Sequence, residues 1–285
     1  AACPYHALTL QNNTLAQRWE HIFGYQGSNE AFMDVLEYYD KGYLISGSYG
    51  QLSGNWIIKT DINGQKLWEK ILTWEDVAVF RSAIDVDNQG NIYCASVVSG
   101  DPVGELPMIT KLDACGKKRW CRVLPQAGYT GGWYDDVLVL DNQDVVSLAS
   151  RNKSTGVFDK LFLDYIDSNG NLLWRKVYAS QENYPLMGQA NPFRIGKFGD
   201  HYIIYGDCYY AYPTNPNHFY LRPLFVMLDS LFNEQWVLPF GVNDSIIGKA
   251  YHTIALNDSV FMGVGAFRLG GNETNALMMF FNDKG

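Results

Sequence analysis

Short runs of alternating apolar and polar residues, each broken by a tight polar turn, recur along the whole chain. In the most regular copies the turn reads Asp-x-x-Gly and the following run carries a Trp, as at 61–68, 113–120 and 167–174. The spans 12–19 and 229–236 keep the same spacing, with Asn or Asp first and Trp last. Alternation with a period of two on both sides of such a turn predicts a β-hairpin, in which the Asp side chain closes the turn and the Gly supplies a positive φ.

Five further hairpins are indicated by the same alternation, at 32–48, 81–97, 136–150, 194–207 and 252–266. The five Trp residues of the first hairpin type are spaced 49, 52, 54 and 62 residues apart. Two hairpins in about 50 residues make a four-stranded antiparallel unit, which is the size of one β-propeller blade.

The two ends of the chain complete the count of strands. An additional Trp-bearing strand is expected at 15–23, whereas the last unit lacks its outer strand. Pairing the two would cover an exposed sheet edge. We therefore predict an all-β fold, a five-bladed propeller of four-stranded antiparallel blades closed by the N-terminal strand. It forms a single domain over 1–285, with an arm at 1–14, the closing strand at 15–23, and blades at about 31–72, 80–124, 134–178, 193–240 and 251–285.

The repeat resembles one that is common in exported proteins of the Bacteroidota. Residues 42–47 read Gly-Tyr-Leu-Ile-Ser-Gly, and residues 58–70 read Ile-Lys-Thr-Asp-Ile-Asn-Gly-Gln-Lys-Leu-Trp-Glu-Lys. Blades four and five depart from this pattern, as where Phe232-Asn233 replaces the turn glycine. The resemblance implies a propeller and export to the cell surface, the medium or the periplasm. Many such proteins leave the cell by type IX secretion through a separate C-terminal domain. The sequence to Gly285 contains no such domain, so we expect either that it stops at the propeller or that this chain travels or is retained differently.

Charge and cysteine content narrow the possible partners. The net charge of -8 leaves no basic surplus for nucleic acid or an anionic membrane, and no apolar run is long enough to span a bilayer. Cys3 follows two alanines and is a possible lipid anchor, although a signal-peptidase scar is the simpler interpretation. Cys94 and Cys208 fall in apolar strands and are expected to be buried, and we do not expect a disulfide between Cys115 and Cys121.

The long connections of a propeller of this topology gather on one face of the disc. Those at 179–192 and 209–220 are rich in Tyr and Pro, and the others lie at 24–30, 73–79 and 125–134. Aromatic side chains on a rigid scaffold suit a glycan or a protein partner, although they can also simply pack the loops together. The predicted ligand-binding residues are Trp74, Tyr129, Trp133, Tyr184, Tyr209, Tyr210, Tyr212, His218 and Tyr220.

Motifs for most catalytic chemistry are missing from the sequence. The His residues have no metal-ligand spacing, and neither a nucleotide-binding loop nor a serine-hydrolase elbow is present, so no metal and no cofactor is expected. The run 85–90 imitates the start of a calcium loop, but Ser96 stands where the closing Glu should be, which favours an ordinary Asx turn.

Two interpretations of function therefore compete. The first is a non-catalytic binding or scaffolding module that contacts an envelope or secreted protein, or a glycan, through the long loops. The alternative is a propeller glycoside hydrolase, which needs two carboxylates at the axial end of the inner strands. The candidates for that pair and its partners are Glu30, Asp34, Asp76, Asp135, Asp136, Arg81, Arg194 and His252.

Overall fold

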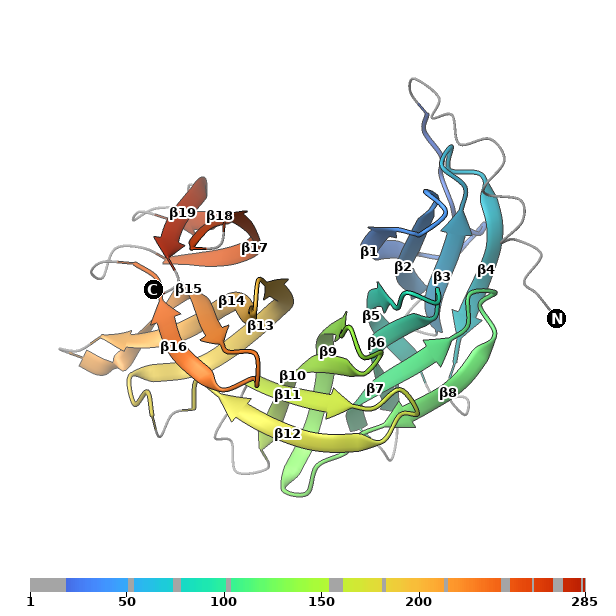
Figure 1. Ribbon diagram of the computed structural model, residues 1–285. Coiled ribbons are helices and arrows are strands. Elements are labelled where there is room, and N and C mark those ends of the chain that lie inside the picture. Colours follow the sequence, from blue (N-terminus) through green and yellow to red (C-terminus); the bar gives the residue numbers. More distant parts are fainter. Residues whose placement is uncertain are drawn as a thin grey trace. The chain divides into compact units, whose positions relative to one another are not determined.

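The computed structural model describes residues 19–285 except 51–53, 74–77, 101–103, 154–160, 181–182, 213–214, 242–246, 258, 269–273, 283 and 285. Every helix or strand assigned in those residues is a β-strand (Figure 1). The strands are β1 (Ala31–Glu37), β2 (Tyr43–Tyr49), β3 (Gly54–Thr60), β4 (Lys66–Leu72), β5 (Ala78–Val86), β6 (Ile92–Gly100), β7 (Gly104–Leu112), β8 (Lys118–Val123), β9 (Tyr129–Val139), β10 (Val145–Lys153), β11 (Leu161–Ile166), β12 (Leu172–Tyr178), β13 (Met187–Phe198), β14 (His201–Tyr212), β15 (Asn215–Leu228), β16 (Glu234–Pro239), β17 (Ile247–Asn257), β18 (Val260–Arg268) and β19 (Asn275–Asn282).

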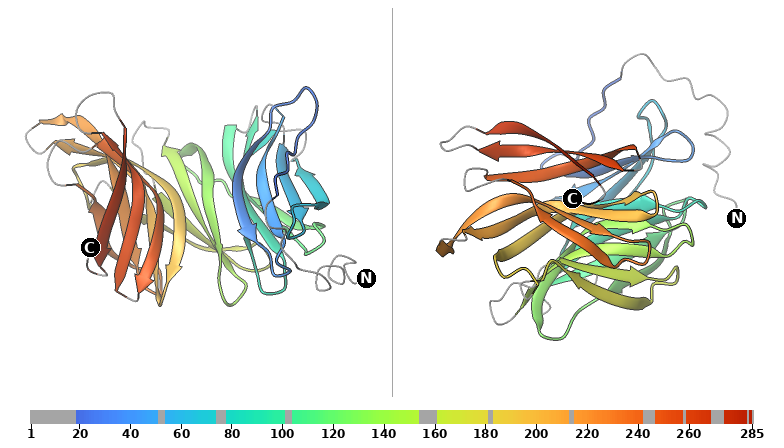
Figure 2. Two further views of the ribbon diagram at one scale, coloured as in Figure 1. Left: turned by 90° about the horizontal axis from the view of Figure 1, so that it is seen from above. Right: turned by 60° about the vertical axis from the view of Figure 1, so that its left-hand side comes forward.

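These strands form five sheets in which neighbours in sequence are neighbours in space. The sheets β1–β4, β5–β8, β9–β12 and β13–β16 each have four strands, and β17–β19 has three in the described part of the chain. The red strands β17, β18 and β19 lie side by side in both further views (Figure 2). The expected all-β fold with five repeated sheets is confirmed. Among the described residues, no helix is long and apolar enough to cross a membrane.

The chain divides into two compact units. The first contains residues 1–147 and 165–174, and the second contains 148–164 and 175–285. In the first unit, a core that includes Tyr38, Leu44 and Ile57 from the first sheet continues into Ile84 and Leu112 of the second. In the second unit, a core from β13 to β19 is dominated by aromatic rings, chiefly Phe198, Phe225, Phe261 and Phe281. Each core therefore joins two consecutive sheets.

The expected turn chemistry is confirmed wherever the Asp-led turn occurs. The Asp113 carboxylate accepts hydrogen bonds from the backbone N–H groups of Cys115 and Lys117, both at 2.9 Å, and Gly116 has a φ of 73°. Asp61, Asp167 and Asp229 close their turns in the same way. In the last of these turns Phe232 takes the glycine position with a φ of 59°. A side chain is tolerated there because the turn is held by the Asp in any case.

Trp68 and Trp120 each pack against a turn of the following sheet. An ideal Cβ on Gly116 would lie 3.0 Å from the ring of Trp68 and 3.2 Å from Lys70. At Gly170 the nearest atoms belong to Trp120, at 3.0 Å, and to Arg122, at 3.2 Å. Gly116 and Gly170 are therefore needed both for their positive φ and because a flat ring lies directly on each of them.

The segment 19–23 was expected to be a strand, but its residues have no strand assignment. A strand is defined by its hydrogen-bonded ladder, and this segment forms none within the described residues. Its side chains nevertheless repeat the contact of the other Trp strands. Trp19 and His21 lie over Gly64, and the ring of His21 is within 3.0 Å of the Asn63 carbonyl oxygen. The remainder of the predicted strand, 15–18, lies outside the described residues.

Several connections that were expected to be loops are strands. The span 209–220 is largely part of β14 and β15, with Tyr210 paired opposite Tyr220 and Ala211 opposite Phe219. In the same way β9 begins at Tyr129 and β13 at Met187. These spans are rich in aromatic residues, which favour strands, so the strands can continue the ladder and satisfy their backbone groups beyond the core.

The cysteines follow their predicted environments. Cys94 and Cys208 are both fully buried. Cys121 is a free thiol, so it does not pair with Cys115, which is disulfide-bonded.

The Trp-on-turn contact predicts a difference between two glycines of similar conformation. Gly116 and Gly128 have φ values of 73° and 83°, but nothing lies within 4 Å of a Cβ on Gly128. Gly128→Ala should cost only the left-handed strain of about 1–2 kcal/mol. Gly116→Ala should cost about 1–3 kcal/mol more, because its methyl group presses on Trp68. Urea unfolding of both variants measures this difference, and equal losses would show that the Trp contact contributes nothing.

Candidate functional site

Carboxylates link the first strands of the sheets in the first unit. Asp34 on β1 accepts a hydrogen bond from the backbone N–H of Ile84 on β5, at 3.0 Å. Asp85 on β5 accepts one from the backbone N–H of Val139 on β9, at 2.7 Å. An unpaired backbone N–H at a sheet edge needs a partner, and here an Asp from the preceding sheet supplies it. The Asp34 carboxylate therefore lies against the backbone beside Asp85, near enough for its charge to raise the pKa of Asp85.

The two carboxyl groups differ in their electrostatics. The pKa of Asp85 is raised to about 6. Burial is the largest cause, the hydrogen bonds from the N–H groups of Val139 and Val86 oppose it, and the negative charge of Asp34 adds to the rise. Desolvation is the largest of these influences, since a partly buried carboxylate loses water that two N–H groups replace only in part. A carboxyl group that holds its proton near pH 6 beside a second carboxylate is a common arrangement for acid–base catalysis.

A cavity of about 210 Å³ lies beside Asp85, on the side of the tight turns. Val86 and Val139, the two residues whose N–H groups bond to Asp85, both line it. The carboxylates of Asp87 and Asp141 add negative charge to its wall. The complete lining is Val86, Asp87, Asn88, Val139, Leu140, Asp141 and Gln143.

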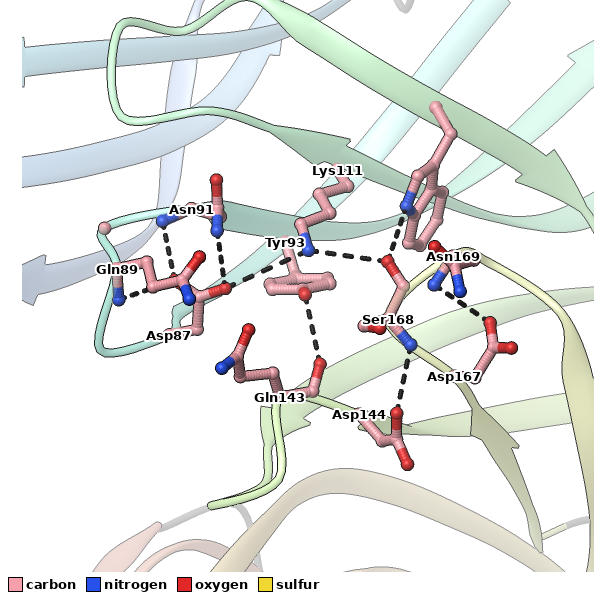
Figure 3. Close-up of polar contacts among 12 residues, drawn as sticks. Asp87, Gln89, Asn91, Tyr93, Lys111, Gln143, Asp144, Asp167, Ser168 and Asn169 are labelled. Carbon is pink, nitrogen blue, oxygen red and sulfur yellow. Dashed lines mark hydrogen bonds and ion pairs between the residues drawn. The ribbon is translucent and has the colours of Figure 1, made fainter. Parts of the chain in front are cut away.

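Asp87 is the centre of a polar network at this cavity (Figure 3). It is buried, and its Oδ1 accepts hydrogen bonds from the backbone N–H groups of Gln89 and Asn91, at 3.0 and 2.8 Å. Its Oδ2 lies 3.9 Å from the Lys111 ammonium and accepts a 2.7 Å hydrogen bond from the Asn91 side chain. The calcium-like run 85–90 is therefore an Asx turn, as the sequence favoured.

Lys111 connects the second sheet to a turn of the third (Figure 3). Its ammonium lies 4.7 Å from the centre of the Tyr93 ring and 3.4 Å from the Ser168 carbonyl oxygen, which also accepts a bond from Trp120. The Tyr93 hydroxyl in turn donates to the Gln143 carbonyl oxygen at 3.1 Å. Burial lowers the pKa of Lys111. The network fixes the turns that surround the cavity, so the cavity is rigidly framed.

A second buried charge cluster lies in the other unit. Asp164 is fully buried and lies between Arg151, at 2.9 Å, and Arg175, whose terminal nitrogen is at 2.6 Å. Such a cluster holds its strands in register, because removing one partner leaves a buried charge uncompensated.

The predicted aromatic ligand residues differ in their environments in the described part of the chain. Tyr209 is 42% exposed, whereas Tyr210 and Tyr220 face each other across β14 and β15, with the Arg222 guanidinium 5.2 Å from the Tyr210 ring. The Tyr184 hydroxyl donates a hydrogen bond to Glu234, and the Trp133 indole N–H donates one to Asp135. Tyr129 is half-buried. Trp74 and the side chains of Tyr212 and His218 lie outside the described residues. This set of binding residues stays a prediction.

The predicted carboxylates and their basic partners are also dispersed. Asp135 accepts the indole N–H of Trp133 at 2.9 Å, Asp136 is buried, and Glu30 accepts a hydrogen bond from Ser28. In the second unit, His252 is 3.1 Å from the Tyr205 hydroxyl, and Arg194 is paired opposite Tyr205. Asp76 and the Arg81 side chain lie outside the described residues.

Sequence reasoning missed Asp85 as the partner of Asp34. Asp85 was considered only as part of a calcium-like turn, although its position on the first strand of the second hairpin places it next to the preceding sheet. Among the described residues, no group of three or more metal-ligating side chains could hold a metal ion.

Repeated four-stranded antiparallel sheets that follow one another along the chain define the β-propeller class. An α-L-arabinofuranosidase from Fusarium graminearum matches 88% of this chain and 93% of its own, with a TM-score of 0.54 and 11% identity. An endo-arabinase from Bacteroides thetaiotaomicron matches 84% and 88%, with a TM-score of 0.51 and 11% identity. An exo-β-1,3-galactanase from Phanerochaete chrysosporium matches 89% of this chain and 59% of its own, with a TM-score of 0.50 and 9% identity.

No protein-family model and no curated protein sequence matches the chain. At these low identities the likeness establishes the fold. The three solved chains compared above are named as glycan-cleaving enzymes, which contradicts the expectation of a non-catalytic binding or scaffolding module.

The pKa of Asp85 predicts how stability depends on pH. Its folded pKa is about 6 and its ordinary value is 3.8, so the folded state binds the proton more tightly. The stability that this confers is present below about pH 4 and is lost as the pH rises through 6. Between pH 4 and 7 the free energy of unfolding should therefore fall less in Asp85→Asn than in the wild type.

Asp167→Asn provides the control with the opposite sign. Hydrogen bonds from Asn171 lower the pKa of Asp167, so its contribution is present above the ordinary value and is lost as the pH falls. Urea unfolding at pH values from 3 to 7 separates the two variants, because Asp85→Asn should depart from the wild type between pH 4 and 7 and Asp167→Asn only below about pH 4. Parallel curves for Asp85→Asn and the wild type would mean that Asp85 titrates in the folded protein as it does in the unfolded chain.

Proposed function

We propose that the protein is a β-propeller glycoside hydrolase in which Asp85 and Asp34 form the acid–base pair. The observation that carries the proposal is the pairing of a carboxyl group of pKa about 6 with a second carboxylate on the adjacent first strand. Glycosidases need such a pair, with one member protonated and the other ionised at working pH. The named activities of chains with the same fold support this choice over other acid–base chemistry.

The two groups would have different roles in cleavage. Protonated Asp85 donates its proton to the glycosidic oxygen as the bond from the anomeric carbon to that oxygen breaks. Asp34 faces the positive charge that develops on the sugar, and acts either as nucleophile or as the base that takes a proton from water. The backbone N–H groups on Asp85 hold its carboxyl group in place in both protonation states, so the site is preorganised.

We propose separately that the second unit contacts glycan through the aromatic residues of β14 and β15. Tyr209 and Phe219 are 42% and 46% exposed and present ring faces of the kind on which sugars stack. The names of the similar structures suggest arabinan and β-1,3-galactan as the first polysaccharides to test.

The proposed roles predict a leaving-group dependence. With aryl glycosides of poor leaving-group ability, Asp85→Asn should lower kcat/KM by about 10²–10⁴-fold, because proton donation is lost. With a dinitrophenyl glycoside, which needs no proton, it should retain most of its activity. Asp34→Asn should lose activity on both substrates.

Thermal melting identifies variants that fail to fold, and Asp167→Asn serves as the control for loss of an Asp outside the pair. In the wild type, kcat/KM should fall as the pH rises above about 6, because the acid loses its proton. Wild-type-like activity of both Asn variants would refute the assignment of the pair, and the absence of turnover by the folded wild type across these glycans would refute the function.

We further propose that the five sheets form a single closed propeller, in which the predicted closing strand at 15–23 supplies the fourth strand beside β19. The proposal is supported by the contacts of Trp19 and His21 with Gly64, which are equivalent to the contacts of Trp68 and Lys70 with Gly116. Closure would leave no sheet edge exposed.

Amide hydrogen exchange tests closure. A chain lacking residues 1–23 should lose protection in β19, while β3, which has a strand on each side, keeps its protection. Unchanged exchange in β19 would show that its edge has no such partner.

A further inference from the structure

A pocket of about 240 Å³ lies between the last two sheets of the second unit. Leu221 on β15 forms one wall, and residues of β17 and β18 form the rest, chiefly Lys249, Tyr251, Phe267 and Arg268. Gly248 also lines the pocket, and a Cβ there would lie 2.7 Å from the Ala266 carbonyl oxygen. The volume is below the range of roughly 300–1,000 Å³ that suits drug-sized ligands, so a single ring is the largest group that it would enclose.

The pocket carries positive charge in an acidic protein. Lys249 and Arg268 both line it, whereas the protein as a whole has a net charge of -8. The Arg268 Nε donates to the Thr274 hydroxyl at 3.1 Å, which orients the guanidinium. A fixed guanidinium presents paired N–H donors that match the two oxygens of a carboxylate.

A buried carboxylate holds the lysine in position. Asp207 is fully buried and lies 3.3 Å from the Lys249 ammonium, and the Asn191 side chain donates to its other oxygen at 2.7 Å. Burial raises the pKa of Asp207. The Lys249 side chain is 41% exposed, so its ammonium can still reach a ligand. Two cations against one carboxylate leave at least one positive charge for that ligand.

The apolar part of the pocket suits the face of a sugar ring. The Tyr251 side chain is 54% exposed, and its ring stacks on Phe193 with centres 6.3 Å apart and an angle of 22° between the planes. A supported and exposed aromatic ring of this kind binds the C–H face of a pyranose at low entropic cost.

We propose that this pocket binds a monosaccharide unit that carries a carboxylate, such as a hexuronate. The carboxylate would lie between Arg268 and Lys249, and the ring would stack on Tyr251. Arg268 and Lys249 thus recognise the charge of the ligand, and Tyr251 recognises the flat face of its ring. The proposal does not depend on the hydrolase function, because binding here needs neither Asp34 nor Asp85.

Isothermal titration calorimetry on the whole chain tests the site, with galacturonate, glucuronate, galactose and acetate as probes. At least one uronate should bind at least tenfold more tightly than both galactose and acetate. Arg268→Gln should weaken uronate binding at least tenfold, and Tyr251→Ala should do the same. Arg119→Gln, which changes an exposed arginine on β8, should leave binding unchanged.

Thermal melting confirms that each variant is folded, and Thr274→Val offers a milder second test, because it removes the hydroxyl that orients Arg268. Failure of both uronates to bind the folded wild type would overturn the proposal, as would binding that survives Arg268→Gln. If acetate bound as tightly as the uronates, the pocket would recognise no sugar ring. If galactose bound as tightly as the uronates, the pocket would recognise no carboxylate. Asp85→Asn should bind uronate with wild-type affinity, and this result would separate the binding site from the proposed catalytic pair.

Discussion

The packing of a Trp ring on the glycine turn of the next sheet is the contact on which the repeat depends. It restricts three features of the sequence together: the glycine must lack a side chain, the Asp must hold the turn, and the ring must extend beyond its own sheet. Trp68 on Gly116 and Trp120 on Gly170 show the complete form. In the second unit Lys176 keeps the contact without a glycine, because its ammonium binds the carbonyl oxygens of Leu231 and Phe232 at 2.9 and 3.0 Å. Because this contact holds the sheets together, their sequences can vary elsewhere. The first strands and the connections are therefore available to form a functional site.

The sequence was sufficient for the sheets because their signals are local. Period-two alternation, an Asp and a Gly at fixed spacing, and a Trp four residues after the Gly determine each hairpin without reference to the rest of the chain. The exceptions were also local in origin. The span 209–220 reads as a loop by composition, but its tyrosines continue the ladder of β14 and β15. Export and a lipid anchor at Cys3 stay predictions, since they concern steps that a folded chain does not record.

The candidate site could not be predicted to the same degree, because it depends on contacts between sheets. Asp34 was recognised as a carboxylate near the start of a blade, but its neighbour Asp85 became apparent only once both were seen to bond to the backbone of the next strand. Nor does the sequence indicate that Asp207 contacts Lys249, since the two residues are 42 positions apart and lie on different sheets. Burial decides the pKa of both aspartates, and burial follows from packing between sheets rather than from spacing along the chain.

The direction of the Trp contact has a consequence for how the chain folds as it is synthesised. A Trp ring stays uncovered until the turn on which it packs, about 50 residues further on, has been synthesised. Trp19 packs on the turn at Gly64, and Trp68 packs on the turn at Gly116. At rates of about 5–20 residues per second, a sheet leaving the ribosome would keep an uncovered indole for several seconds. The most recently made sheet is thus always the unfinished one. An interruption of synthesis at any point would leave one apolar ring exposed, so a truncated chain carries at its end a surface that chaperones can bind.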